Sequence, residues 1–170
     1  MVIWITGLSA SGKTTLSKAF EKEYKSQIPN MVLLDGDVIR QLYGNDIGYE
    51  ESDRKIQIQR IQSLAAFLEQ QGILVVVAAL YANERILQKN RELFDEYYEI
   101  YLKAEISSLQ KREIKEIYKQ ALEKKMSHVV GVDIPYFEPV DPFMLFRVED
   151  GLSPDVMAKM LYNKIFDKEK

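Results

Sequence analysis

Short apolar runs alternate along the chain with longer segments in which apolar residues recur every three or four positions. The runs are typical of buried strands, and the recurring spacing is typical of amphipathic helices. Strands are predicted at 2–6, 31–34, 73–80, 97–102 and 143–148, and helices at 14–25, 38–43, 52–71, 83–94, 107–125 and 154–166. This alternation predicts an α/β domain in which a mostly parallel five-stranded sheet has helices on both faces.

Glycine and proline mark several boundaries. Gly72 predicts a helix stop before the third strand, and Ser153-Pro154 predicts the start of the last helix. No repeat, low-complexity stretch or linker divides the 170 residues, so we expect one domain, residues 1–170. The proline-rich stretch 131–142 has few helix signals and is predicted to be an ordered loop, of a length at which loops are usually functional.

Residues 7–14, Gly-Leu-Ser-Ala-Ser-Gly-Lys-Thr, fit the phosphate-binding pattern G-x-x-x-x-G-K-[ST] without a mismatch. They lie between a predicted strand and a predicted helix, so backbone N–H groups and the helix N-terminus converge on one point. We expect Lys13 to reach the β- and γ-phosphates of a nucleotide and the Thr14 hydroxyl to bind Mg²⁺. The alternative is a chance glycine- and serine-rich turn before a helix. The predicted nucleotide-binding residues of this loop are Gly7, Leu8, Ser9, Ala10, Ser11, Gly12, Lys13, Thr14 and Thr15.

Two carboxylates follow the second predicted strand, in the run Asp35-Gly36-Asp37. Ligands of doubly wound sheets bind beyond the carboxyl ends of the strands, so both acids are expected at the ligand edge. Phosphoryl transfer needs charge neutralisation and an oriented nucleophile, so one carboxylate of the pair is expected to bind Mg²⁺ and its waters and the other an acceptor hydroxyl. The structural alternative is that Asp37 only caps the helix that follows it. Arg40, one turn along that helix, is expected to face the same side and to bind an anionic acceptor or a surface acid.

Composition and charge exclude several kinds of partner and of structural site. The net charge of −3 gives no basic footprint for a nucleic acid, and the absence of cysteine excludes disulfides and cysteine-ligated zinc. The longest apolar run, 73–81, is too short to span a bilayer, and residues 1–6 are interpreted as a strand and not as a signal peptide. We therefore expect a cytoplasmic protein without membrane or nucleic-acid partners. The single histidine, His128, is interpreted as a loop residue and not as a catalyst.

Together the motifs resemble those of the adenylylsulfate (APS) kinase family, whose members transfer the γ-phosphate of ATP to a nucleotide 3′-hydroxyl. The resemblance covers about residues 1–139. It begins with the phosphate loop, continues through 34–40, Gly48-Tyr49 and Asp53-Arg54, and ends with Gly-Val-Asp-Ile-Pro-Tyr-Phe-Glu-Pro at 131–139. It implies the three-layer fold of a P-loop kinase with a helical lid at about 107–130. It also implies ATP and Mg²⁺ as cofactors, a small-molecule nucleotide acceptor and a homodimer.

The resemblance also implies roles for individual residues. Lys13, Asp35 and Asp37 would be catalytic, and Thr14 and Asp35 would hold the metal. Arg112 and Lys115 match a lid whose cations close over the phosphates, and Arg112 is counted with the nucleotide-binding residues. The alternative for the basic residues of this region is a solvated helix face. The residues implied to bind the acceptor are Asp37, Arg40, Tyr49, Arg54, Gln57, Val129 and Asp133.

The acceptor half departs from the family pattern more than the ATP half does. Ala79-Leu80-Tyr81-Ala82 stands where the family has Ser-Pro-Tyr-Arg, and Gln57 stands where it has asparagine. Val129 replaces one of the two aromatic rings that hold the acceptor base, while Tyr49 keeps the other. In the phosphate loop the one change is Ala10 for glycine. This pattern favours the same reaction on a different acceptor.

One branch of the family, cytidine diphosphoramidate kinase, fits this description. Its members phosphorylate the 3′-hydroxyl of a cytidine nucleotide in the pathway that adds O-methyl phosphoramidate to bacterial capsule sugars. Similarity to this branch in length, in the phosphate loop and in the Asp-Gly-Asp segment implies cytidine 5′-diphosphoramidate as the acceptor. Three alternatives stay open: an APS kinase of sulfate assimilation, another small P-loop kinase, and a nucleotide-binding regulator without turnover.

Overall fold

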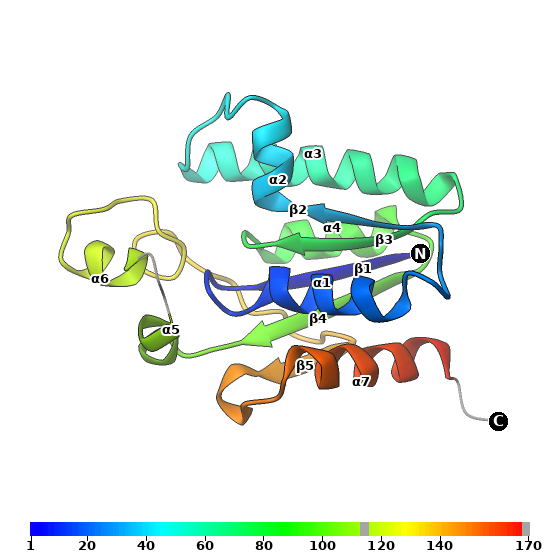
Figure 1. The fold of residues 1–170 in the computed structure, drawn as a ribbon. Helices are drawn as coiled ribbons and strands as arrows, with labels where there is room; N and C mark the ends of the chain where they lie inside the picture. Colours follow the sequence, from blue (N-terminus) through cyan, green and yellow to red (C-terminus); the bar gives the residue numbers. More distant parts are fainter. Residues whose placement is uncertain (113–115, 168–170) are drawn as a thin grey trace.

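The computed structural model describes residues 1–112, with only the backbone of Arg112, and residues 116–167. Within these residues, five strands form one sheet in the order β2-β3-β1-β4-β5, and every neighbouring pair is parallel. All five predicted strands are confirmed, and the sheet is wholly rather than mostly parallel (Figure 1). The strands are β1 (Val2–Gly7), β2 (Met31–Asp35), β3 (Leu74–Ala79), β4 (Tyr97–Lys103) and β5 (Met144–Arg147).

Two apolar clusters, one on each face of the sheet, form the core. Because side chains alternate along a strand, Trp4 of β1 belongs to one cluster and Ile3 to the other. The first cluster includes residues of α3 (Glu51–Gln70), and the second includes residues of α1 (Lys13–Tyr24) and α7 (Pro154–Phe166). Figure 1 shows α1 and α7 side by side. Burial on both faces explains why the central strands are continuous apolar runs in the sequence.

Four further helices and a 3₁₀ turn complete the described elements. The prediction of one helix over 107–125 is wrong, because the structure has two separate helices there. Glu116, directly before the second of them, has a left-handed backbone with φ of 50°, which a continuous right-handed helix does not contain. These elements are α2 (Gly36–Leu42), α4 (Glu84–Leu93), α5 (Ile106–Arg112), α6 (Ile117–Leu122) and the 3₁₀ turn η1 (Val148–Asp150).

The predicted boundary signals are confirmed at two helices. Gly72, just after α3, has φ of 75°, and its N–H donates to the carbonyl oxygen of Glu69. At the start of α7, Ser153 Oγ accepts a hydrogen bond from the N–H of Val156, and Pro154 occupies the first turn. These ends are therefore fixed by local chemistry.

Parallel pairing brings the carboxyl ends of the strands to one edge of the sheet. The loops after β1, β2 and β3 therefore open on the same side, toward α5 and α6 in Figure 1. This edge is where the sequence places its phosphate loop and its paired carboxylates. Among the described residues, no helix is long and apolar enough to cross a bilayer.

Candidate active site

The phosphate loop is a compact turn between β1 and α1. Gly7 is required by space, because a Cβ at this position would lie 2.6 Å from the carbonyl oxygen of Leu102 and 2.7 Å from Ser11 Oγ. Gly12 has φ of 100°, a conformation that favours glycine. Ala10, which replaces a glycine of the family pattern, has φ of 61°. A left-handed conformation costs such a residue about 1–2 kcal/mol, so this departure strains the loop.

Two polar groups of this loop are positioned for phosphate. Lys13 Nζ donates to the carbonyl oxygen of Leu8 at 2.6 Å, across the loop. Ser11 Oγ is buried and has no hydrogen-bond partner within the described ranges. A buried hydroxyl without a partner is costly, so an oxygen of a bound phosphate at this point would stabilise the loop. The residues present therefore fit the phosphates of ATP.

Lys13 lies within electrostatic reach of two carboxylates. Burial lowers the pKa of Lys13 from its usual 10.5 to about 8, and Asp37 and Asp35 oppose that shift. The three residues predicted to be catalytic thus meet where β1 and β2 end.

Asp35 has two hydrogen-bonding tasks at the end of β2. Its Oδ1 accepts from the backbone N–H groups of Asp37 at 2.9 Å and Val38 at 3.4 Å, which makes Asp35 the N-cap of α2. Its Oδ2 accepts from the Thr14 hydroxyl at 2.6 Å. Hydroxyl and carboxylate oxygens are ligands that Mg²⁺ prefers, so Thr14 and Asp35 fit a magnesium site. The alternative that Asp37 caps this helix is wrong. The Asp37 carboxylate is exposed and can therefore contact a ligand.

Two buried arginines lie beside Tyr49 on the acceptor side. Arg40 is 6% exposed and Arg54 is 9% exposed, and neither forms an ion pair with a carboxylate in the described part of the chain. Arg40 Nη1 donates to two carbonyl oxygens of the following loop, at 2.9 and 2.8 Å. Arg54 donates to the carbonyl oxygen of Tyr49 at 3.0 Å and to that of His128 at 2.6 Å. Burial, and then the charge of Arg40, lower the pKa of Arg54 from its usual value.

The Tyr49 ring rests on these cations. The Cζ atoms of Arg40 and Arg54 lie 4.5 and 5.6 Å from its centroid, within the range of a cation–π contact. The ring is still 56% exposed, so part of it remains open to a ligand.

The other three residues expected at the acceptor occupy different environments. Gln57 Nε2 donates to the carbonyl oxygen of Gly36 at 2.9 Å, and its buried Oε1 has no partner among the described residues. Val129 is 5% exposed and belongs to the apolar cluster. The carboxylate of Asp133 accepts from the N–H groups of His128 and Val129, at 2.5 and 2.6 Å. Burial raises the pKa of Asp133, but these N–H groups outweigh it and lower the pKa, so Asp133 shapes the loop.

The end of β3 forms a closed wall. Ala79 is 2% exposed and Ala82 is fully buried, so the positions of the family's serine and arginine are enclosed by packing here. Between them, Tyr81 donates its hydroxyl to Glu51 Oε1 at 2.8 Å. Burial and this carboxylate raise the pKa of Tyr81 to about 12, which keeps the hydroxyl protonated.

Helix α6 reaches the phosphate loop directly. The fully buried Tyr118 donates its hydroxyl to the carbonyl oxygen of Ser9 at 3.2 Å. The expected lid contacts fall outside the described residues, because Lys115 and the side chain of Arg112 are not among them. Sequence reasoning missed Asp46, whose carboxylate pairs with Arg60, because nothing in local spacing connects residues 14 positions apart.

This chain matches one family model and is similar to two kinds of characterised kinase. The family model for adenylylsulphate kinase matches residues 1–147. A cytidine diphosphoramidate kinase from Campylobacter jejuni is 36% identical over 138 residues, which cover 81% of each chain. An adenylyl-sulfate kinase from Bacillus licheniformis is 35% identical over 143 residues, which cover 83% of this chain and 73% of the relative. The two kinds of relative are about equally similar.

A solved structure matches nearly the whole chain. The Mycobacterium tuberculosis APS kinase, in complex with AMPPNP and APS, superposes with a TM-score of 0.87 and 26% identity, over 96% of each chain. This likeness confirms the predicted P-loop kinase fold with helices on both faces of the sheet.

Proposed function

Because this chain belongs to the adenylylsulphate kinase family, we propose that it phosphorylates the ribose 3′-hydroxyl of a cytidine nucleotide with ATP. Its relatives are phosphotransferases that act on a hydroxyl acceptor, and so is this chain. The acceptor we favour is cytidine 5′-diphosphoramidate, named for the Campylobacter jejuni relative. The reaction would then serve capsule phosphoramidate biosynthesis in the cytoplasm.

The observation that carries the proposal is the pair of buried, carboxylate-free arginines beside an exposed tyrosine. Burying a cation without a directly paired carboxylate is costly, so Arg40 and Arg54 favour an anionic ligand. Their hydrogen bonds use Arg40 Nη1 and the Nε and Nη2 atoms of Arg54, which leaves further N–H donors on each guanidinium. Tyr49 offers a ring face for a base. A charged group and a base on one molecule are what a nucleotide presents.

The donor side of the site would neutralise and orient the phosphates of ATP. Lys13 and the N–H groups of the phosphate loop would bind the β- and γ-phosphates, and Ser11 Oγ would gain the partner it lacks. Thr14 and Asp35 would hold Mg²⁺, which neutralises charge on the transferred phosphoryl group.

Asp37 would act on the acceptor. As its carboxylate takes the 3′-hydroxyl proton, a bond forms between that oxygen and the γ-phosphorus, the bond to the β,γ-bridging oxygen breaks, and ADP leaves. Asp37 is exposed at the strand edge, near Lys13, and is not needed to cap α2.

The choice of cytidine over APS is supported by the wall around the acceptor. Ala79, Ala82 and Val129 are all buried and apolar, so the family's serine, arginine and second aromatic ring are absent. The adenylyl-sulfate kinases, at similar identity, support the alternative that the acceptor is APS. Following the family resemblance, we also propose a homodimer, which light scattering would test.

The deciding measurement is kcat/KM with a panel of acceptors. ATP consumption is followed with cytidine 5′-diphosphoramidate, CDP, APS and free nucleosides, and the phosphorylated position is read by NMR. We expect the cytidine acceptor to exceed APS by about tenfold or more. A preference for APS would place the chain in sulfate assimilation. Absence of turnover with every acceptor, despite ATP binding, would favour a regulator.

A further inference from the structure

The loop between α2 and α3, residues 43–50, carries Tyr49 to the acceptor side. We call it the acceptor loop. Gly44 and Asn45 have left-handed backbones, with φ of 70° and 53°, and reverse the chain after α2. Their N–H groups donate back to the carbonyl oxygens of Gln41 and Arg40. Beyond this reversal, the carbonyl oxygens of residues 47–49 are bonded by arginine side chains.

Arg60 holds the outer side of the acceptor loop. Its Nη1 and Nη2 donate to the two carboxylate oxygens of Asp46 at 2.7 and 2.6 Å. Its Cζ also lies 4.4 Å from the ring centroid of Tyr43. Paired parallel hydrogen bonds fix both distance and orientation, unlike the contact of a single point charge. Arg60 therefore connects both the beginning and the middle of the loop to the rigid helix α3.

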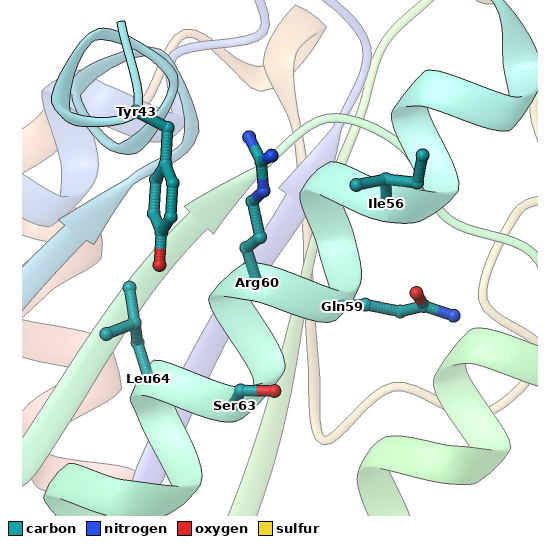
Figure 2. Close-up of a pocket in the computed structure, with 6 residues that line it drawn as sticks. All are labelled: Tyr43, Ile56, Gln59, Arg60, Ser63 and Leu64. Atoms are coloured by element: carbon teal, nitrogen blue, oxygen red, sulfur yellow. The ribbon is translucent and has the colours of Figure 1, made fainter. Parts of the chain in front are cut away.

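Apolar packing does not replace this contact on the outer side. Tyr43 and Arg60 border an open cavity of about 360 Å³, which Figure 2 shows against α3. Its other lining residues are Ile56, Gln59, Ser63 and Leu64. Because this space is open, the ion pair and the cation–π contact are the specific polar restraints that connect Asp46 and Tyr43 to the helix.

We propose that Arg60 is a positioning residue for the acceptor nucleotide: through Asp46 and Tyr43 it fixes the acceptor loop that presents Tyr49. The proposal rests on the proposed function, in which Tyr49 meets the acceptor base. Arg60 itself touches no substrate in this scheme. Its loss allows the loop to leave the binding-competent conformation, and the apparent acceptor affinity falls in proportion to the competent fraction. The phosphate loop has no contact with Arg60 among the described interactions, so ATP binding is unaffected.

The test compares Arg60→Ala and Asp46→Asn with a matched control, Gln59→Ala, an exposed neighbour on the same helix. We expect the first two variants to raise the acceptor KM about fivefold, with the ATP KM and kcat within about twofold of wild type. Arg60→Lys keeps the charge but loses the paired geometry, so it should fall between Arg60→Ala and wild type. The exchange Arg60→Asp with Asp46→Arg should recover most of the loss.

Hydrogen exchange of the amides of residues 44–49, measured without acceptor, makes the test independent of acceptor identity. Exchange should be faster in Arg60→Ala and unchanged in Gln59→Ala. Unchanged exchange and acceptor KM in Arg60→Ala, or an equal rise in the ATP KM, would overturn the proposal. If wild type phosphorylates no nucleotide, the proposed function fails, and the exchange data then decide separately whether Arg60 holds the loop.

Discussion

The phosphate loop and the acceptor side of this kinase are built in different ways. The phosphate loop is one continuous segment, and its shape follows from glycines at fixed positions, such as Gly7 against Leu102. The acceptor side is assembled from segments far apart in sequence. Arg54 of α3, for example, bonds the carbonyl oxygen of His128, 74 residues away.

This difference explains where the chain keeps the family pattern and where it departs from it. The donor side would bind the same phosphates in any such kinase, and its phosphate loop departs from the family pattern only at Ala10. The acceptor side depends on which side chains meet across the edge of the sheet. Changes at Ala79, Ala82 and Val129 can therefore alter the acceptor while the donor geometry is kept.

The largest expected effect comes from the carboxylate between the two halves. Asp37→Asn should lower kcat by about 10²–10⁴-fold, because a positioned base is lost, with little change in ATP affinity. Its melting temperature should match wild type, since Asp35 caps α2. Asp35→Ala, by contrast, should lose about 0.5–2 kcal/mol of stability, because alanine cannot cap the helix. Steady-state kinetics and calorimetry measure both. A stability loss in Asp37→Asn with normal kcat would remove it from the chemistry.

Loss of the donor-side cation comes next. Lys13→Ala should lower kcat by about 10²–10³-fold, because a preorganised charge at the transferring phosphoryl group is removed. Lys18→Ala, an exposed lysine of α1, is the matched control and should be unaffected. Circular dichroism checks that the fold is kept. Activity of Lys13→Ala within tenfold of wild type would refute the assignment of the phosphate site.

The titration of Lys13 gives a pH dependence on the donor side. Its ammonium is protonated below a pKa of about 8, so kcat/KM for ATP should fall about tenfold per unit as pH rises above that value. In Lys13→Arg the guanidinium stays charged, so the fall should disappear whatever the absolute rate. A pH–rate profile from pH 6 to about 10 measures this. If kcat/KM falls equally at high pH in wild type and in Lys13→Arg, the fall belongs to a group other than Lys13.

On the acceptor side, Arg54→Lys should raise the acceptor KM about tenfold and leave the ATP KM unchanged. Lysine keeps the charge but cannot bridge the carbonyl oxygens of Tyr49 and His128 as the planar guanidinium does. Initial-rate kinetics with each substrate varied in turn measure the split. An equal rise in both KM values would show that Arg54 supports the fold as a whole.

The smallest expected effect is on selectivity. Val129→Phe should shift the ratio of kcat/KM toward APS by about fivefold, because it restores the aromatic ring that the family resemblance implies at this position. It should also cost about 1–3 kcal/mol of unfolding free energy, since Val129 is buried in the core. Val129→Leu adds volume without an aromatic ring and is the control. Equal selectivity in Val129→Phe and Val129→Leu would show that an aromatic ring at position 129 does not determine which base is accepted.

Sequence patterns identified the elements whose signals are local. The five strands, the phosphate loop and the start of α7 at Ser153 follow from apolar runs, glycine spacing and capping chemistry. The break between α5 and α6 was missed, because a continuous helical pattern does not reveal the left-handed Glu116. The sequence offered Asp37 as the alternative cap of α2, whereas Asp35 caps the helix, because two neighbouring aspartates are equally suited by type.

By itself, the sequence determined the fold class and the phosphate loop, since these depend on residues close together in the chain. Only the tertiary structure decided that Arg40 and Arg54 are buried without carboxylates, and that Arg60 supports the acceptor loop through Asp46. It also decided that Asp133 shapes its own loop. Burial and pairing between distant segments arise when the whole chain packs, and these contacts set the charge and shape that an acceptor meets.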